Sequence, residues 1–207
     1  MKMKNLSIRQ KLSIAIILCG CVLIMISLGL NLYSVRKNKR EVIAFQKTYI
    51  DTSQSNTEQV KEIKDETDEK IDDSDVIAIL RIPTINCEEI VRKGSDKRAL
   101  HGALGHVAKT ANPGELGNCA IAGHRNYNFG LYFNRLNEVR LDDEIMIDTK
   151  DATYTYKVMS IKVVEPEEVS VLESTDEATI TLITCTPLYI ATHRLIVSGS
   201  LINVEYR

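Results

Sequence analysis

Residues 181–187 read Thr-Leu-Ile-Thr-Cys-Thr-Pro, and residues 192–197 read Thr-His-Arg-Leu-Ile-Val. Both stretches are rich in β-branched side chains, which favours two β-strands joined by a short loop. Pro187 has no backbone N–H to give to a ladder, so the first strand should end beside Cys185. If the two strands pair, Arg194 lies next to Cys185. A cysteine with a rigid strand behind it and an open loop in front meets the structural needs of a nucleophile.

Short strands of the same kind recur through the C-terminal two thirds of the chain. Several of them within about 130 residues predict a mostly β fold, either a closed barrel or a sandwich. One short helix is expected over Ser95–His101, with Ser95 as its N-cap. The other expected strands are Val76–Ile82, Glu89–Val91, Asn118–Ala122, Glu144–Asp148, Thr153–Val164, Thr179–Cys185 and Arg194–Val204.

A second informative stretch covers residues 114–125 and reads Gly-Glu-Leu-Gly-Asn-Cys-Ala-Ile-Ala-Gly-His-Arg. It predicts a strand that ends at Gly123, where the missing side chain permits close backbone approach. His124 would then lie at the mouth of the strand and face a loop. Cys185, His124 and Arg194, brought together from separate strand ends, would form an acyl-transfer site.

The ordinary titration of these side chains indicates what the arginine would contribute. A free cysteine is only about 3% thiolate at pH 7, and a free histidine is about a quarter protonated there. A fixed positive charge near the sulfur favours the thiolate. The same guanidinium can hold a developing oxyanion, while an imidazolium at His124 protonates the leaving amine.

The N-terminal region is of a different kind. Leu12–Tyr33 is almost wholly apolar and would be about 33 Å long as a helix, enough to cross a bilayer. We interpret it as an uncleaved signal anchor rather than a cleaved signal peptide, because no small-residue cleavage site follows it. The flanking basic residues nearly balance, and the N-terminal amine and Glu41 favour a cytoplasmic N-terminus. They are Lys2, Lys4, Arg9 and Lys11 before the apolar run, and Arg36, Lys37, Lys39 and Arg40 after it.

These patterns divide the chain into four segments. We expect residues 1–11 to form a cytoplasmic tail, 12–33 the transmembrane anchor, 34–75 a polar and increasingly acidic linker, and 76–207 the domain that carries the expected catalytic site. The formal net charge is only −2 and tryptophan is absent. Neither a basic surface nor a stacking platform for nucleic acid is therefore expected. The five cysteines include no C-x-x-C pair, so neither a disulfide framework nor a structural zinc site is indicated.

From about Ile77 to Leu201 the chain resembles the sortases, the surface-protein transpeptidases of Gram-positive bacteria. The resemblance rests on matching elements in the same order. They are Pro113 to Asn118, Ala122-Gly123-His124, Phe133 to Leu136 followed by Asp143 to Ile145, Thr181 to Cys185, and Arg194. It implies an eight-stranded sortase-type β-barrel with short helices, behind one N-terminal transmembrane helix.

The same resemblance implies the chemistry. Cys185 would be the nucleophile, His124 the acid and base, and Arg194 the residue that holds the oxyanion or positions the substrate. Thr184 and His193 would contact the substrate. Sortases cleave an LPXTG-like sorting signal between Thr and Gly, hold the acyl part as a thioester, and transfer it to an amine of a peptidoglycan precursor or a pilin. The domain would then lie outside the cell on a single-pass anchor.

Other candidate residues have simpler expected roles. Cys119 should be a small buried side chain within its strand, and a pairing with Cys87 remains open. His101 and His106 should make structural hydrogen bonds. No metal or other cofactor is expected, although Glu165, Glu167 and Glu168 around Pro166 leave calcium as a minor alternative.

The subclass is open. The Thr-Cys-Thr-Pro and Thr-His-Arg-Leu motifs are similar to those of pilus-assembling class C sortases. However, residues 42–75 contain no proline for a lid motif of the Asp-Pro-aromatic kind, and the given sequence has no second apolar run after its last strand. These two features favour wall anchoring, as in class A or D. The alternatives are a pilin polymerase, a hydrolase that uses water, and a membrane-tethered binding module without activity.

Overall fold

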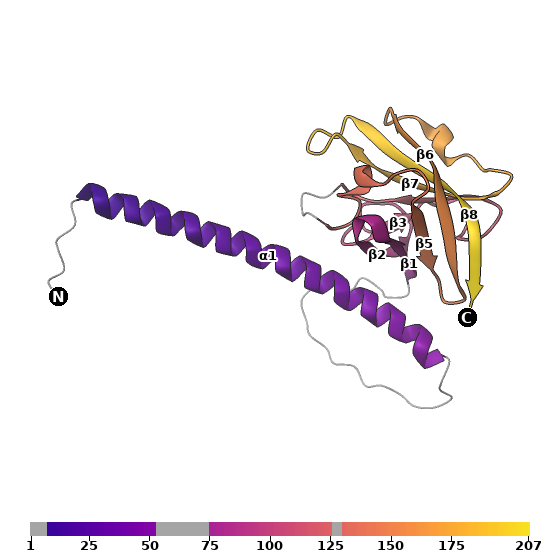
Figure 1. The fold of residues 1–207 in the computed structure, drawn as a ribbon, viewed down its shortest axis with the longest axis horizontal. Helices are drawn as coiled ribbons and strands as arrows, with labels where there is room; N and C mark the ends of the chain where they lie inside the picture. The colour runs from indigo at the N-terminus through magenta and orange to yellow at the C-terminus, as the bar shows by residue number, and fades with distance from the viewer. Residues whose placement is uncertain (1–7, 53–74, 126–129) are drawn as a thin grey trace. The chain divides into compact units, whose positions relative to one another are not determined.

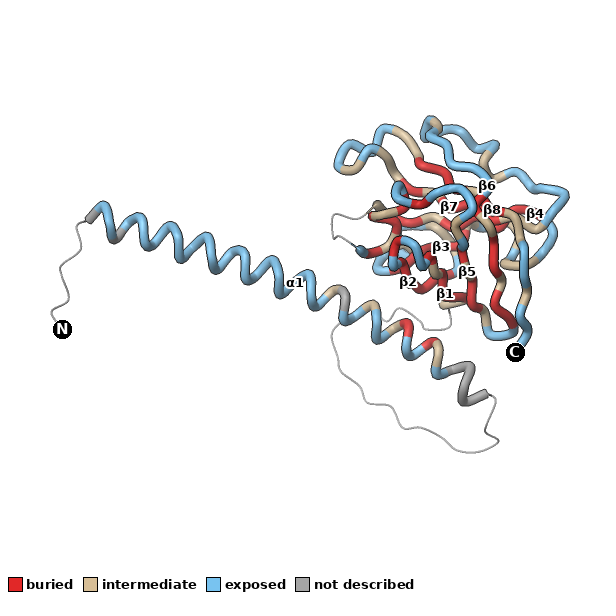
Figure 2. The backbone as a smooth tube through the Cα atoms, viewed as in Figure 1, coloured by how far each residue is buried: buried red, intermediate tan, exposed pale blue. Residues whose placement is uncertain are grey.

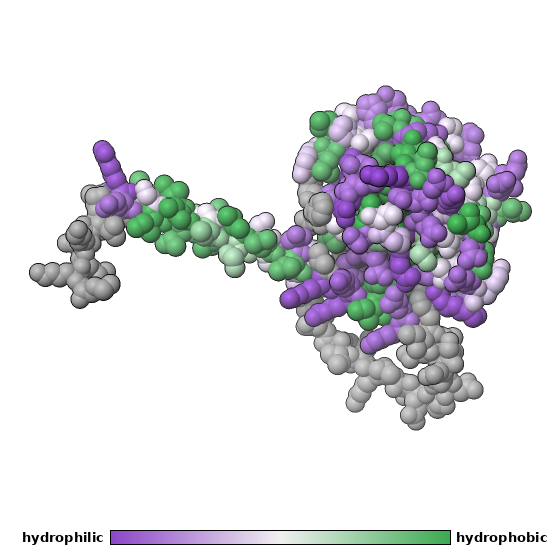
Figure 3. Space-filling view, in the orientation of Figure 1, coloured by the Kyte–Doolittle hydropathy of each residue, from purple (hydrophilic) through white to green (hydrophobic). Residues whose placement is uncertain are grey.

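In the computed structural model, residues 8–52, 75–125 and 130–207 are described, and the chain divides into two units, Met1–Lys39 and Arg40–Arg207. The helix α1 covers Ile8–Thr52. By length and composition, its segment Leu12–Lys47 would suffice to cross a membrane, and the other described residues include no second such helix. The apolar side chains of this helix form the green stretch of Figure 3.

The helix continues past Tyr33, where the polar linker was expected to begin, because residues 34–52 contain no glycine or proline that would end it. Within the second unit, Val42 and Phe45 are buried against Ile79, Ile90 and Ala103. The expected linker residues 53–74 lie outside the described residues.

The second unit is built on eight strands that close into a barrel, as Figure 1 shows. Their order around the barrel is β1-β2-β3-β4-β7-β8-β6-β5, with β1 paired to β5 to complete the closure. Two pairs, β2–β3 and β4–β7, are parallel, and the rest are antiparallel. The strands are β1 (Val76–Ile82), β2 (Cys87–Lys93), β3 (Leu104–His106), β4 (Gly117–Ala122), β5 (Glu144–Asp148), β6 (Ala152–Val164), β7 (Ala178–Thr186) and β8 (His193–Tyr206).

Three short 3₁₀ helices connect these strands. They are η2 (Pro83–Ile85), η3 (Leu136–Glu138) and η4 (Val169–Leu172). The predicted eight-stranded, mostly β barrel is therefore confirmed. The expected helix at Ser95–His101 is wrong, because this segment forms turns. Asp96 rather than Ser95 stabilises them, since its side chain accepts a hydrogen bond from the Ala99 amide at 2.8 Å.

The core fills the barrel with alternate side chains from each strand, as a strand with one buried face requires. Ile147, Leu182 and Val197 are fully buried members of this cluster, and Figure 2 shows the buried positions concentrated on the strands. Each such aliphatic side chain stabilises the fold by about 1.5–3 kcal/mol through burial. Tyr156 is also fully buried, and its hydroxyl accepts a hydrogen bond from the Gly114 amide at 2.8 Å.

Candidate active site

Cys185 is the last but one residue of β7, as the loss of the ladder donor at Pro187 predicted. Its neighbours Leu182 and Thr184 point toward the barrel interior, so Cys185 lies on the outer face. The side chain is half-buried and the thiol is free. Directly opposite, in the antiparallel ladder with β8, is Arg194. Opposed residues in such a ladder have Cα atoms about 4.5–5.5 Å apart and side chains on the same face.

His124 follows the end of β4, which runs parallel to β7, and lies near Cys185. Ala122 is in register with Ile183, and the Gly123 amide donates to the Ile183 carbonyl at 3.0 Å. His124 and Cys185 each lie two residues beyond this pair along their strands, so they are level with each other. Neighbouring strands lie about 4.8 Å apart, so the imidazole and the thiol come from adjacent strand ends. The His124 side chain is exposed.

Close packing behind His124 fixes its backbone. A Cβ atom on Gly123 would lie 2.4 Å from Leu104 Cδ2 and 2.7 Å from Phe133 Cδ2. Only glycine fits there without displacing these side chains. The Phe133 amide also donates to the His124 carbonyl at 3.2 Å. The backbone of His124 is therefore held rigidly, even though the residue lies beyond the end of β4.

Thr184 differs from its expected role as a substrate contact. Only 2% of the residue is exposed, and its hydroxyl donates to the Gly123 carbonyl at 2.8 Å. This bond ties the end of β7 to the end of β4, one residue before each reactive side chain. Thr184 is thus placed to position Cys185 and His124 from behind.

A hollow of about 320 Å³ opens beside the thiol. It contains the two reactive groups and is walled by the β7–β8 loop. The lining residues are His124, Arg125, Cys185, Pro187, Leu188, Tyr189 and Ala191. Tyr189 and Ala191 have positive φ angles of 72° and 60°, so the loop turns sharply here.

Arg125 was missed by the sequence reasoning, although it directly follows His124. Its Nη1 donates to the Thr186 hydroxyl at 2.8 Å, and its Nε donates to the Asn134 carbonyl at 3.5 Å. It therefore links the segment after β4 to the end of β7. The sequence signal that could have identified it is a second cation beside the reactive histidine.

Arg194 is half-buried, and backbone carbonyls hold its guanidinium. Its Nη1 donates to the His193 carbonyl at 3.1 Å and to the Ala191 carbonyl at 3.3 Å. These bonds use one of its two terminal nitrogens and leave the other donors for a ligand. A cation in this position can stabilise negative charge on a bound carbonyl oxygen.

His193 begins β8 and lies at the rim. Its Nε2 is 3.2 Å from Glu165 Oε1, and its Nδ1 is 2.9 Å from the Thr192 hydroxyl. Hydrogen bonds from the Ser170 side chain and from the Ser170 amide lower the pKa of the Glu168 carboxyl. No group of three His, Cys, Asp or Glu side chains among the described residues could hold a metal ion.

The two other cysteines of the barrel have a different environment. Cys87 and Cys119 are both buried and free, so they do not pair. Burial raises the pKa of Cys119 to about 12 and raises that of Cys87 well above its usual value. Both are inert as nucleophiles, which confirms the expected buried role of Cys119. His106 is buried as expected, with its Nε2 2.9 Å from the Ala111 carbonyl.

Comparisons with known proteins agree with this geometry. The sequence profile described as the sortase domain matches residues 80–202. Sortase SrtE1 of Streptomyces coelicolor is 36% identical over 146 residues, which is 63% of this chain and 41% of that protein. Sortase A of Bacillus anthracis is 26% identical over 84% of this chain and 80% of that protein.

A solved structure is also similar over most of the chain. The sortase D5 transpeptidase of Clostridium perfringens has 30% sequence identity and a TM-score of 0.63. The match covers 80% of this chain and 98% of that structure. Because the profile match spans more than half of the sequence, this chain belongs to the sortase family of transpeptidases.

Proposed function

We propose that this protein is a membrane-anchored cysteine transpeptidase that cleaves an LPXTG-like sorting signal between Thr and Gly. The acyl part of the cleaved protein is held on Cys185 and then transferred to an amine. The observation that supports this most directly is the register of three strand ends. It brings Cys185 opposite Arg194 in the β7–β8 ladder and level with His124 at the end of β4.

In the first half-reaction, the Cys185 thiolate attacks the carbonyl carbon of the Thr–Gly bond. The carbonyl oxygen becomes an oxyanion, and the Arg194 guanidinium donates hydrogen bonds to it. The C–N bond then breaks, and the imidazolium of His124 gives its proton to the leaving amine. The products are a thioester on Cys185, neutral His124 and the free glycine amine.

The second half-reaction reverses these roles with a different amine. The incoming amine attacks the thioester carbonyl, and neutral His124 accepts the proton that this nitrogen loses. The C–S bond breaks and the thiolate of Cys185 is restored. The new peptide bond joins the surface protein to its acceptor, and Arg194 again stabilises the oxyanion.

The acceptor we favour is an amine of a peptidoglycan precursor rather than of a pilin. This preference rests on residues 42–75, which contain no proline for a lid motif of the Asp-Pro-aromatic kind. We further infer that α1 is a single-pass anchor with its N-terminus in the cytoplasm. Its apolar segment is long enough for that role. The barrel would then work outside the cell, near the membrane surface.

The proposal is tested with the full-length chain in detergent micelles. An LPXTG peptide without added amine should give an adduct on intact enzyme that has the mass of the acyl fragment. This adduct should be absent in Cys185→Ala, which keeps the fold because the site is half-exposed. Adding an amine should convert the adduct into a ligated product.

Two results would contradict the proposal. One is a complete absence of the adduct with wild-type enzyme over a panel of LPXTG-like peptides. The other is equal product formation by Cys185→Ala. If the adduct forms but water is the preferred acceptor even at high amine concentration, the protein is a hydrolase instead.

A further inference from the structure

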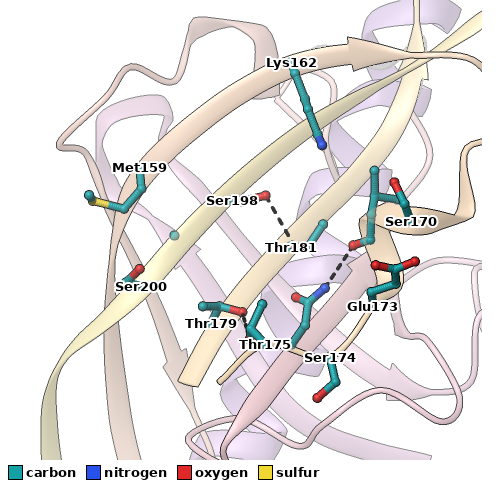
Figure 4. Close-up of a pocket in the computed structure, with 13 residues that line it drawn as sticks. Met159, Lys162, Ser170, Glu173, Ser174, Thr175, Thr179, Thr181, Ser198 and Ser200 are labelled. Atoms are coloured by element: carbon teal, nitrogen blue, oxygen red, sulfur yellow. Dashed lines mark hydrogen bonds between the residues drawn. The ribbon is translucent and has the colours of Figure 1, made fainter. Parts of the chain in front are cut away.

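A second hollow lies on the outer face of the barrel, away from the thiol. Its volume is about 300 Å³, and it lies between four strands and the β6–β7 connection. Figure 4 shows that its side chains are mostly small hydroxyls. They come from β7 and β8 at the floor and from the connection at the wall: Thr179, Thr181, Ser198, Ser200, Ser174 and Thr175. We call this hollow the hydroxyl groove.

The hydroxyl groove is on the same face of β7 as Cys185. Thr181 and Thr179 precede Cys185 by four and six positions, so all three side chains alternate to the outer face. Their partners across the ladder are Ser198 and Ser200, as Arg194 is the partner of Cys185. At about 3.3 Å per residue, the groove lies about 13–20 Å from the thiol along the strand.

The Thr175 and Thr179 hydroxyls bond to each other at 2.9 Å, but other hydrogen-bonding groups of the groove are unused. Among the described residues, Ser174 and Ser200 have no partner for their hydroxyls, and Lys162 and Glu173 at the edges form no ion pair. The Thr181 and Ser198 hydroxyls are only weakly paired, at 3.4 Å. These groups offer both donors and acceptors, as the backbone of an extended peptide requires.

One buried amide holds the groove open. Asn118 on β4 is only 4% exposed, and its Nδ2 donates to the Val171 carbonyl at 2.9 Å. This bond fixes the β6–β7 connection above the strands. The other end of the amide, Oδ1, is buried without a partner among the described residues. A buried unpaired acceptor is costly, and this amide oxygen of β4 is therefore available to a ligand that enters the groove.

The position of His124 sets the direction of the substrate. Its proton goes to the leaving amine, and it later accepts one from the incoming amine. Both amines must therefore approach on the side of the hollow that contains His124 and the β7–β8 loop. The acyl chain has to depart on the other side of Cys185. On the outer face of β7, the residues that precede Cys185 lie on that side, and they lead to the hydroxyl groove.

We propose that the hydroxyl groove binds the extended segment of the donor protein immediately before its sorting motif. This inference rests on the proposed transpeptidase function. If the threonine at the cleaved bond is level with Cys185, an extended chain brings the residue before the motif level with Thr181. The third residue before the motif is then level with Thr179. Polar segments rich in Ser, Thr and Asn suit these hydroxyls.

The test compares two donor peptides with the full-length chain in detergent micelles. One peptide starts at the Leu of the motif and is acetylated, and the other carries four polar residues before it. For wild-type enzyme, the longer peptide should have a KM about 3- to 10-fold lower, as one or two added hydrogen bonds provide. The double variant Ser198→Ala/Ser200→Ala should remove this advantage while kcat stays the same.

Two further variants test whether the effect comes from the groove. Thr181→Val keeps the side-chain shape without the hydroxyl and should also raise KM for the longer peptide alone. Thr84→Ala removes an exposed hydroxyl on η2, outside the groove, and should change neither KM. Thermal unfolding of each variant verifies that the barrel is intact.

Three outcomes would overturn the inference while the proposed function survives. They are equal KM values for the two peptides with wild-type enzyme, variants that affect both peptides equally, and variants that change the KM of the amine acceptor instead. The last outcome would assign the groove to the acceptor. If wild-type enzyme turns over neither peptide, the proposed function fails, and this inference fails with it.

Discussion

Cys185 and Arg194 are direct partners in the antiparallel ladder between β7 and β8, so the sheet itself fixes the two residues side by side, with their side chains on the same face. Eight residues separate them in sequence, and the loop between the two strands lines the hollow. This pairing gives the arginine a precise place without any side-chain partner. It also makes the role of Arg194 testable apart from the role of Cys185.

Arg194→Ala should lower kcat/KM for a sorting-signal peptide by about 10²–10³-fold, because a hydrogen-bond donor to the oxyanion is lost. Arg194→Lys should recover only part of this loss, since a lysine keeps the charge but not the planar fork. Steady-state kinetics with peptide and amine measure both. The melting temperature should change little, because the guanidinium bonds, among the described residues, to the backbone carbonyls of the exposed Ala191 and of His193 at the start of β8.

Arg125→Ala is the matched control for this experiment. Arg125 lines the hollow, but its guanidinium already bonds to Thr186 and Asn134. We expect a smaller loss of activity than for Arg194→Ala. Near-normal turnover by Arg194→Ala, or a larger loss of activity for Arg125→Ala, would show that Arg194 is not the residue that contacts the oxyanion.

Gly123→Ala should destabilise the barrel and displace His124. The new methyl group would lie 2.4 Å from Leu104 Cδ2, and overpacking of this kind costs about 1–3 kcal/mol. The loss of kcat/KM should exceed what the loss of folded protein explains, because the displaced residue, His124, carries the reactive imidazole. Chemical denaturation and steady-state kinetics measure the two effects.

A second substitution tests the stated cause. Leu104→Val shortens the side chain that the methyl group meets, so it should partly rescue Gly123→Ala in a double-mutant cycle. The double variant should therefore be more stable than the sum of the two single stability losses predicts. Additive losses from the two substitutions would show that contact with Leu104 does not explain the effect.

Much of this arrangement could be predicted from local sequence. The ends of β4 and β7 were marked by Gly123 and by Pro187, and the sequence motifs identified the residues beside them. The three-residue strand β3 was missed, because Leu104–His106 is too short for a periodic pattern and has a glycine at its centre. The helix expected from Ser95 failed because Asp96 competes as the capping residue.

The register between strands could not be predicted in the same way. β4 and β7 are separated by more than fifty residues, and their parallel pairing sets His124 level with Cys185. The inward position of Thr184 and the hydroxyl groove also depend on this pairing. Such contacts follow from closure of the barrel, which no local pattern specifies.

Thr184→Val separates the positioning role from the expected substrate contact. The substitution removes the hydrogen bond to the Gly123 carbonyl and leaves that oxygen buried. We expect a stability loss of about 1–3 kcal/mol and a lower kcat with little change in KM. Thr184→Ser keeps the hydroxyl and should preserve most of the activity. A higher KM with unchanged stability would instead support direct contact with substrate.

Thiol reactivity should single out Cys185 among the barrel cysteines. Cys87 and Cys119 are 5% and 1% exposed, and burial raises the pKa of both thiols. At neutral pH, an alkylating reagent should modify Cys185 in the folded barrel, while the other two react only after denaturation. Peptide mapping by mass spectrometry measures this. Rapid labelling of Cys119 in the native protein would contradict the burial described for β4.

Alkaline pH should weaken the barrel through buried groups that resist ionisation. The pKa of Cys119 is raised to about 12 by burial, and that of Tyr132 is raised to about 12 by burial and by Glu89. When a folded pKa is raised, the unfolded chain releases its proton first. The stability is therefore complete below the unfolded values, about 9 for Cys and 10 for Tyr, and decreases progressively toward pH 12.

Thermal unfolding of the full-length chain in micelles, followed by far-UV circular dichroism, should show a falling melting temperature between about pH 9 and pH 12. Cys119→Ala removes one of the two groups, so its melting temperature should be less sensitive to pH over this range, even if it starts lower because of the small cavity. Tyr132→Phe should act in the same direction. If the melting temperatures of wild type and both variants decreased equally with rising pH, neither group would be responsible for the loss of stability at alkaline pH.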